Sequence, residues 1–207
     1  MKEIILHKKA IFLILAFILI GLNAGAEEPT SRPPGITHIL GDQSMTFSLG
    51  GFIPLFFIRL ADGTVEATNM VFGAKGSLQY NTYLAHTWLL SFELAGALGF
   101  TPNFNIYWSL PLTAKISYIW YLAPLELYFT LGLGANFQSF LGFSRVDFIT
   151  RPEMGIYFLL DTKLKLGLSF SYWFNPQFAS AEQEATKPGQ SRIGNFMDVS
   201  ISLIYHL

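Results

Sequence analysis

Apolar and polar residues alternate along most of the chain after position 45. Residues 196–207 show this pattern most clearly, with apolar side chains at alternate positions: Met197, Val199, Ile201, Leu203, Tyr205 and Leu207. Polar residues such as Asp198 and Ser200 stand between them. A period of two is that of a β-strand, whose successive side chains point to opposite faces. The pattern therefore predicts a final strand with one apolar face.

Seven earlier segments show the same alternation, which predicts eight strands in all. The approximate ranges of the eight strands are 45–53, 70–80, 88–100, 106–121, 125–138, 153–160, 164–174 and 196–207. Pro54 is expected to end the first strand, and residues 139–151 are expected to form a loop. The connections after every second strand are mostly longer, as in outer-membrane barrels with short periplasmic turns and long external loops. The prediction is an all-β fold: an eight-stranded antiparallel transmembrane β-barrel, an up-and-down meander with both termini periplasmic.

The positions of the charges indicate which medium the apolar face contacts. Every charge within a predicted strand lies on the other face: Lys75, Glu93, Lys115, Glu126, Glu153, Lys165 and Asp198. A charge on the lipid face would cost about 2–4 kcal/mol at the membrane midplane. The opposite face is otherwise rich in small residues, which suits the narrow lumen of an eight-stranded barrel. Residues 45–207 are therefore predicted to form a membrane barrel.

The composition supports this class and excludes several others. Only 13% of the residues are charged, against roughly a quarter in soluble domains. The absence of cysteine excludes disulfides, thiolate metal sites and a lipid-bearing cysteine. With a net charge of −1 and no basic cluster, nucleic acid is not an expected partner.

The first 44 residues are predicted to lie outside the barrel. Residues 1–26 have the three parts of a secretory signal peptide: a basic start, an apolar run over residues 10–22, and the small residues Ala24-Gly25-Ala26 before a cleavage site. An uncleaved N-terminal anchor is the alternative. Residues 27–44 contain several prolines and glycines and are expected to form an irregular lead.

The signal peptide, the amphipathic strands and the Tyr205/Leu207 pattern resemble small bacterial outer-membrane barrels such as OmpA, OmpX and OmpW, and also small barrels of spirochaetes. The resemblance is one of architecture and covers about residues 45–207. It implies outer-membrane lipid as a partner, and recognition of residues 196–207 by the barrel-assembly machinery. That signal usually ends in Phe or Trp, and Leu207 departs from it.

Charges on the lumenal face are the first candidate functional residues. Lys75 and Glu93 are expected near mid-height on adjacent strands, whereas Lys115, Glu126 and Lys165 are expected near the periplasmic end. Buried charges must be paired. The residues could form a salt-bridged plug that fills the barrel, or a polar constriction that acts as a gate.

Pro111 is the second candidate, because it lies inside a predicted strand of a closed barrel, where a proline cannot donate a ladder hydrogen bond. It could mark a tolerated bulge or a lateral opening to the membrane, an arrangement that the resemblance to OmpW-like barrels implies. Phe52, Tyr107 and Trp173 are expected to form an apolar upper lumen near it. The alternative is that the first strand extends further and the loops pack on each other.

The sequence contains no signature of catalysis. None of the four histidines, His7, His38, His86 and His206, stands in a His-x-Ser motif or has metal-ligand spacing, and no Gly-x-Ser-x-Gly elbow occurs. A lipid-modifying enzyme is therefore the least favoured function, and neither a metal nor a cofactor is expected. The favoured function is a narrow channel that passes small hydrophobic molecules. The alternative is a closed structural or surface-interaction barrel that displays its external loops, chiefly residues 175–195.

Overall fold

The computed structural model describes residues 38–140, 142–179 and 191–207. These residues form nine β-strands: β1 (Gln43–Arg59), β2 (Val65–Ala67), β3 (Val71–Ala85), β4 (Trp88–Phe100), β5 (Ile106–Leu122), β6 (Leu125–Phe140), β7 (Phe143–Asp161), β8 (Leu164–Gln177) and β9 (Arg192–His206). Among them, no helix is long and apolar enough to cross a membrane. The predicted signal peptide, residues 27–37 of the predicted lead and residues 180–190 of the predicted 175–195 loop lie outside the described residues.

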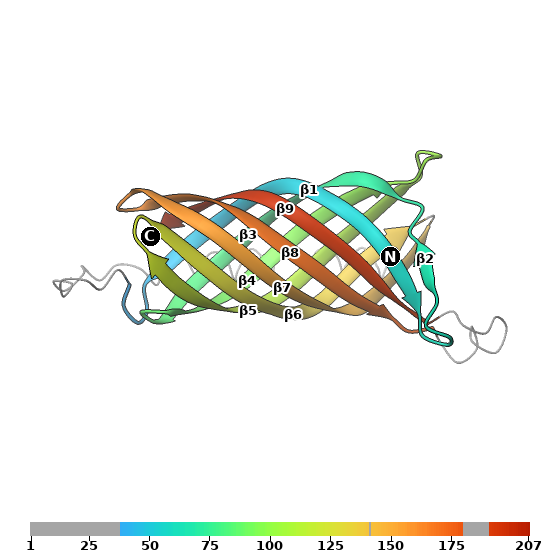
Figure 1. The fold of residues 1–207 in the computed structure, drawn as a ribbon, viewed down its shortest axis with the longest axis horizontal. Coiled ribbons are helices and arrows are strands. Elements are labelled where there is room, and N and C mark those ends of the chain that lie inside the picture. Colours follow the sequence, from blue (N-terminus) through green and yellow to red (C-terminus); the bar gives the residue numbers. More distant parts are fainter. Residues whose placement is uncertain (1–37, 141, 180–190) are drawn as a thin grey trace, which may run out of the picture. The chain divides into compact units, whose positions relative to one another are not determined.

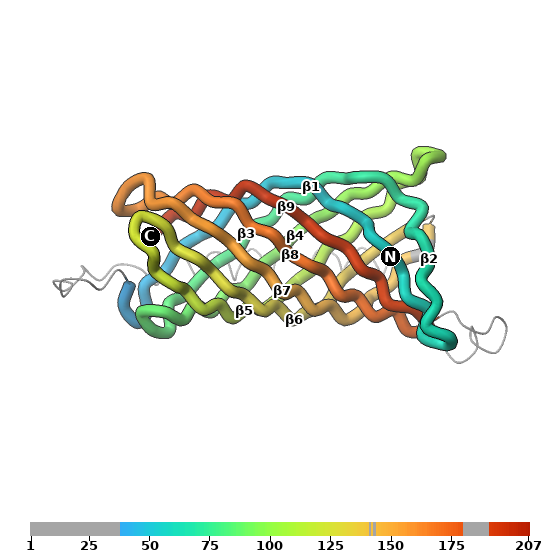
Figure 2. Tube along the Cα trace, viewed as in Figure 1, coloured from blue at the N-terminus to red at the C-terminus, as the bar shows by residue number. Residues whose placement is uncertain are grey.

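Eight long strands form a closed antiparallel barrel. Each strand from β3 to β8 pairs with the next in sequence, and β1 pairs with both β3 and β9. The β1–β9 ladder runs from Ser44 opposite His206 to Arg59 opposite Arg192. The short strand β2 forms a hairpin with the last part of β1. The strands are tilted around the barrel axis, as Figures 1 and 2 show. The predicted fold class is confirmed, and β9 closes the barrel as the final stretch of sequence predicts.

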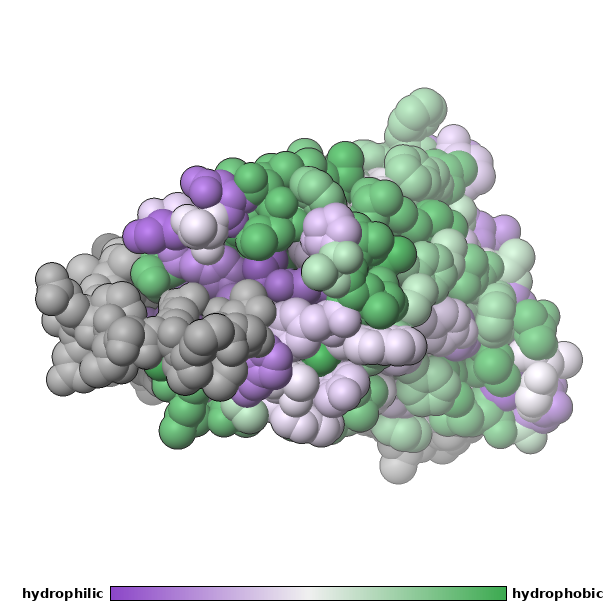
Figure 3. Space-filling view, turned by 60° about the vertical axis from the view of Figure 1, so that its left-hand side comes forward, coloured by the Kyte–Doolittle hydropathy of each residue, from purple (hydrophilic) through white to green (hydrophobic). Residues whose placement is uncertain are grey.

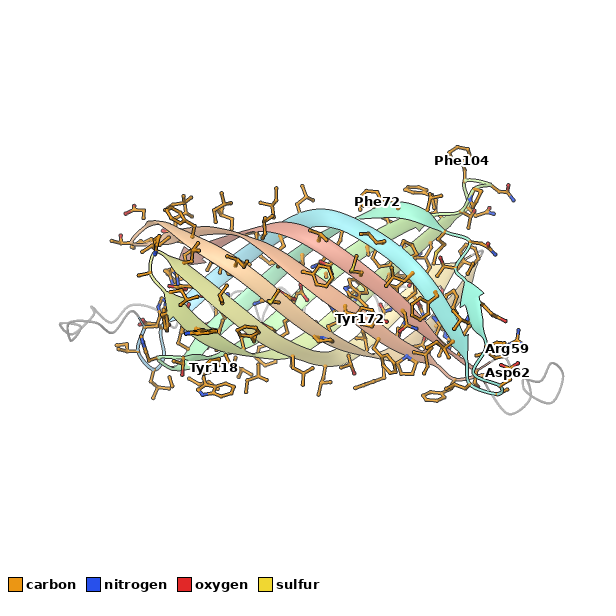
Figure 4. The ribbon with its side chains drawn as sticks, in the orientation of Figure 1. Arg59, Asp62, Phe72, Phe104, Tyr118 and Tyr172 are labelled. Carbon is orange, nitrogen blue, oxygen red and sulfur yellow. The ribbon has the colours of Figure 1, made fainter. Side chains whose placement is uncertain are left out.

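The two ends of the barrel differ in their connections. The tight turns β3–β4, β5–β6 and β7–β8 lie at one end, which we call the turn end; the start of β1 and the C-terminus lie there too (Figure 1). The β1–β2 hairpin and the β4–β5 connection lie at the opposite end, which we call the loop end. Arg59, Asp62 and Phe104 mark the loop end in Figure 4.

The apolar face of the strands forms the outer wall of the barrel. Large apolar side chains such as Leu112, Leu168 and Ile201 are more than half exposed there, and apolar residues cover much of the wall in Figure 3. The charged side chains of the opposite face point into the lumen, where Lys75, Glu93 and Lys115 are each 2% exposed. The predicted division into an apolar outside and a charged inside is confirmed.

Two predicted boundaries were wrong by more than five residues, and both ends of the predicted 175–195 loop belong to strands, since β8 runs to Gln177 and β9 begins at Arg192. Pro54 does not end β1, which continues to Arg59. The ladder with β9 shifts register between Pro54 and Phe56, and such an irregularity tolerates a proline. The first strand thus extends further than its predicted end, as the alternative reading of the upper lumen requires.

The second wrong boundary concerns the predicted loop at 139–151. Residues 143–151 belong to β7, and its ladder with β6 is continuous from Phe143 onward. Val146 and Phe148 point outward, whereas Asp147 and Arg151 point inward. Asp147 and Arg151 are lumenal side chains with partners, so the alternation continues through the segment.

A tyrosine packs tightly against two glycines in the wall of the turn-end half. A Cβ atom at Gly155 or Gly167 would lie 2.5 or 2.4 Å from the ring of Tyr157. Only glycine leaves this space, because real Cβ contacts are essentially never shorter than 3.0 Å. The absent side chains therefore allow Tyr157 to occupy the lumen beside β7 and β8.

Candidate functional site

Side chains in the lumen form three layers. An apolar cluster lies toward the loop end and contains Phe52, Phe57, Ala97, Tyr107, Ile149, Trp173 and Phe196. A second cluster, rich in tyrosine, lies toward the turn end and contains Tyr83, Leu89, Ile119, Tyr128, Tyr157 and Ile204. Between them lies a group of six charged residues, which we call the central charge network: Lys75, Glu93, Lys115, Arg151, Glu153 and Asp198.

Three cations and three carboxylates alternate within the central charge network. Lys75 Nζ lies 2.9 Å from Asp198 Oδ1 and 3.8 Å from Glu93 Oε1. Lys115 Nζ lies 3.1 Å from Glu93 Oε2 and 2.6 Å from Glu153 Oε2. Arg151 bonds to Glu93 through Nη1, and its Nη2 lies 3.4 Å from Asp198 Oδ2. The network joins strands from several sides of the barrel, and its formal charges cancel.

The central charge network closes the lumen at mid-height. The side chains of Lys75, Glu93, Lys115, Arg151 and Asp198 are at most 2% exposed, and that of Glu153 is 12% exposed. Side chains that line an open, water-filled pore would be in contact with water. The near-zero exposure therefore indicates that protein atoms fill this section of the barrel, as the narrow interior of eight strands predicts.

The lumenal charges form groups that differ from the predicted ones. Lys115 was expected near the turn end with Glu126, but it lies in the central charge network with Glu93. Because the strands tilt, residues at different positions along two strands reach the same height in the lumen. Arg151 contacts three carboxylates of the network, but the sequence prediction missed it, because the residue fell in the supposed loop.

Glu126 and Lys165 form a separate pair at the turn end. Lys165 Nζ donates to Glu126 Oε2 over 2.6 Å and to the Tyr128 hydroxyl over 3.4 Å. The same ammonium lies 2.9 Å from Nε2 of His38, whose ring stacks on that of Tyr83 with centroids 4.0 Å apart. The residues just before β1 thus contribute a side chain to the turn end of the lumen.

The apolar upper lumen rests directly on the central charge network. Phe52 and Trp173 are fully buried and Tyr107 is 6% exposed, so these three predicted residues do point inward. Trp173 Nε1 donates to Asp198 Oδ2 over 2.6 Å. The guanidinium of Arg151 lies 4.6 Å from the centroid of the Trp173 ring and makes a cation–π contact. Trp173 therefore links the two layers.

Pro111 interrupts the hydrogen-bonded ladder between β4 and β5. The ladder pairs Leu94 with Leu112 and then resumes with Ala97 opposite Ser109, without a register shift. On its other side, Pro111 pairs with Asn136 of β6 in an unbroken ladder. Pro152, which faces outward, leaves a similar gap between β7 and β8, where pairing stops at Thr150–Phe174 and resumes at Glu153–Ser171.

A cavity of about 370 Å³ lies at the loop end of the lumen. It combines apolar side chains, polar side chains and two arginines, Arg145 and Arg192. We call it the mouth cavity. Tyr107, a member of the apolar loop-end cluster, contributes to its lining. Among the residues that the structure describes, no group of three histidine or acidic residues is arranged to hold a metal ion.

Comparisons with known proteins agree with the architecture. A model of a spirochaete protein family matches residues 27–205. No curated protein matches the sequence. Among solved structures, Neisserial surface protein A has a TM-score of 0.59 at 8% identity, over 81% of this chain and 97% of that one. The outer membrane protein OprG from Pseudomonas aeruginosa has a TM-score of 0.51 at 12% identity, over 82% of this chain and 97% of that one. These similarities show the fold, that of a small outer-membrane β-barrel.

Proposed function

The chain belongs to this spirochaete protein family, and we propose that it is an integral outer-membrane barrel that is closed across its lumen and acts through its loop end. The location follows from a charge-free apolar wall and from the predicted signal peptide, since exposed apolar surface of this extent requires lipid. The two termini then lie on the periplasmic side and the loop end faces outward.

The observation that carries this proposal is the central charge network. Its six side chains fill the lumen and pair with one another. Opening a path would separate buried charges from their partners, and breaking one such pair typically costs about 3–5 kcal/mol. A polar solute cannot offset several such losses during passage. This arrangement favours a structural or surface-interaction role over diffusion through the barrel.

Surface display provides the test. Cells that produce the full chain should bind a host or cell-wall ligand more than cells without it, and a variant lacking residues 180–190 should lose most of that binding. A barrel with the Asp161-Thr162-Lys163 turn at the other end changed to Gly-Ser-Gly is the matched control and should bind as the full chain does. Equal binding by cells with and without the full chain, over a panel of host and cell-wall ligands, would contradict the surface role.

A second candidate function is a narrow channel for small hydrophobic molecules, with a lateral exit at Pro111. The break in the β4–β5 ladder supports it, as does the mouth cavity that adjoins Phe57 and Tyr107. On this route a solute would enter from the loop end and leave sideways above the central charge network. Lys75, Glu93, Lys115, Glu126 and Lys165 would then close the lumen below the exit.

The two prolines allow the lateral route to be tested by substitution. Pro111→Val restores a backbone N–H that can pair with β4, so it should slow uptake of naphthalene by proteoliposomes if the exit is used. Pro152→Val makes the same chemical change between β7 and β8 and should leave uptake unchanged. If the full chain takes up no more naphthalene than protein-free liposomes do, the channel function is wrong.

A further inference from the structure

The mouth cavity contains an arginine whose charge is not neutralised by a neighbouring carboxylate. Arg192, the first residue of β9, donates from Nε to Gln177 Oε1 over 2.8 Å. Its Cζ atom lies 4.0 Å from the centroid of the Phe57 ring. Within residues 38–140, 142–179 and 191–207, its two terminal nitrogens have no hydrogen-bond partner and the guanidinium has no ion-pair partner.

The acidic groups nearby are already engaged by other arginines. Asp147 accepts two hydrogen bonds of 2.6 Å from Arg145 and a third from Gln138. Glu66 bonds to Arg59. The oxygen of the Gln138 amide accepts from Tyr107 over 2.7 Å and from Asn175 over 3.3 Å. Both nearby carboxylates thus have cationic partners, and the one uncompensated charge that lines the cavity among the described residues is positive.

Apolar groups provide the other walls of the mouth cavity. Phe57, Met70 and Phe140 line it beside Arg192 and Arg145. A volume of about 370 Å³ is within the range of small-molecule sites, which are mostly apolar with a few placed polar groups. The guanidinium is held at Nε and against Phe57, which leaves its two terminal nitrogens in the planar fork that pairs with a carboxylate.

We propose that the mouth cavity is a binding site for a small organic anion, with the anionic group on Arg192 and an apolar body against Phe57, Met70 and Phe140. Arg145 adds positive potential but keeps its own partner, Asp147. The site requires neither passage through the barrel nor the surface role proposed above, since it is complete at the loop end.

The test compares two soluble probes that differ in charge, 4-phenylbutyrate and 4-phenylbutanol. Titration calorimetry is carried out on the full chain in lipid nanodiscs, with empty nanodiscs subtracted. The carboxylate should bind at least about tenfold more tightly than the alcohol, as expected for a charge-assisted hydrogen bond. Its affinity should fall with added salt, whereas that of the alcohol should not.

Variants assign the effect to Arg192. Arg192→Gln should remove the preference for the carboxylate and Arg192→Lys should retain part of it. Lys163→Gln removes one positive charge at the turn end, outside the cavity lining, and should behave as the unchanged chain does. Equal affinity for the two probes in the unchanged chain, a carboxylate affinity insensitive to salt, or an unchanged preference in Arg192→Gln would each overturn the proposal. The salt dependence of the unchanged chain decides the matter even if a variant does not fold.

Discussion

Lys75 Nζ lies 2.9 Å from Asp198 Oδ1, and the contact joins β3 to β9 over 123 positions of sequence. Both strands neighbour β1, so the ion pair spans the strand at which the barrel closes. The same carboxyl group accepts from Trp173 over 2.6 Å and from Ser200 over 3.0 Å. Asp198 therefore connects the charge network, the apolar upper lumen and the closing strand.

The first prediction concerns Glu93, which contacts all three cations of the central charge network. Glu93→Gln leaves three buried cations with two carboxylates, so the free energy of unfolding in urea should fall by about 3–5 kcal/mol. Asp62→Asn removes an exposed carboxylate that pairs with Arg59 at the loop end (Figure 4) and should have no measurable effect. If the two variants are equally stable, the network is not a stabilising element.

A double-mutant cycle separates the ion pair from general damage to the lumen. Glu93→Gln and Arg151→Met, measured singly and together, should show a coupling energy of about 0.5–3 kcal/mol, because the two residues bond directly. A coupling energy of zero would mean that each substitution acts through other contacts.

The second prediction concerns the glycine at position 167. Gly167→Ala would place a Cβ atom 2.4 Å from Tyr157 and 2.4 Å from the carbonyl oxygen of Ile156. Overpacking of this kind costs roughly 1–3 kcal/mol, which urea unfolding would detect. Gly76→Ala is the matched control, because the nearest atoms to its Cβ would be 3.9 Å away, and it should be nearly neutral. An equal effect of the two alanines would contradict the tight packing of Tyr157.

The third prediction uses the four tryptophans to distinguish lumen from lipid. Trp88, Trp108 and Trp120 are 41–53% exposed on the outer wall, whereas Trp173 is fully buried in the lumen. In bilayers with brominated lipids, a variant that keeps only Trp108 should lose most of its fluorescence. A variant that keeps only Trp173 should lose little. Strong quenching of Trp173 would contradict its position inside the barrel.

The sequence predicts the barrel because lipid imposes a simple rule on alternate residues. In β4, for example, every second side chain faces a medium that excludes charge, so the predicted range of 88–100 agrees with Trp88–Phe100. The prediction of a loop missed the strand at 143–151, although Asp147 and Arg151 point inward there as the same rule requires. Arg145 pairs with Asp147 of the same strand, but Arg151 pairs with Glu93 of β4 and Asp198 of β9, and no local pattern identifies such partners.

The contacts within the lumen were less predictable than the strands. The neighbouring pair Lys75 and Glu93 follows from strand order, and their Nζ–Oε1 distance is 3.8 Å. The contact between Lys115 and Glu153 depends on strand tilt and crosses the lumen between β5 and β7. Arg192 was not singled out at all, since its importance depends on which nearby carboxylates already have partners.

The central claim is that the lumen is closed at mid-height, and ion flux tests it most directly. The full chain is reconstituted in liposomes, its incorporation is measured by flotation, and the release of an internal potassium gradient is followed. We predict that release equals that of protein-free liposomes at every protein-to-lipid ratio. Release that increases in proportion to the incorporated barrel would show a continuous aqueous path and would contradict the account.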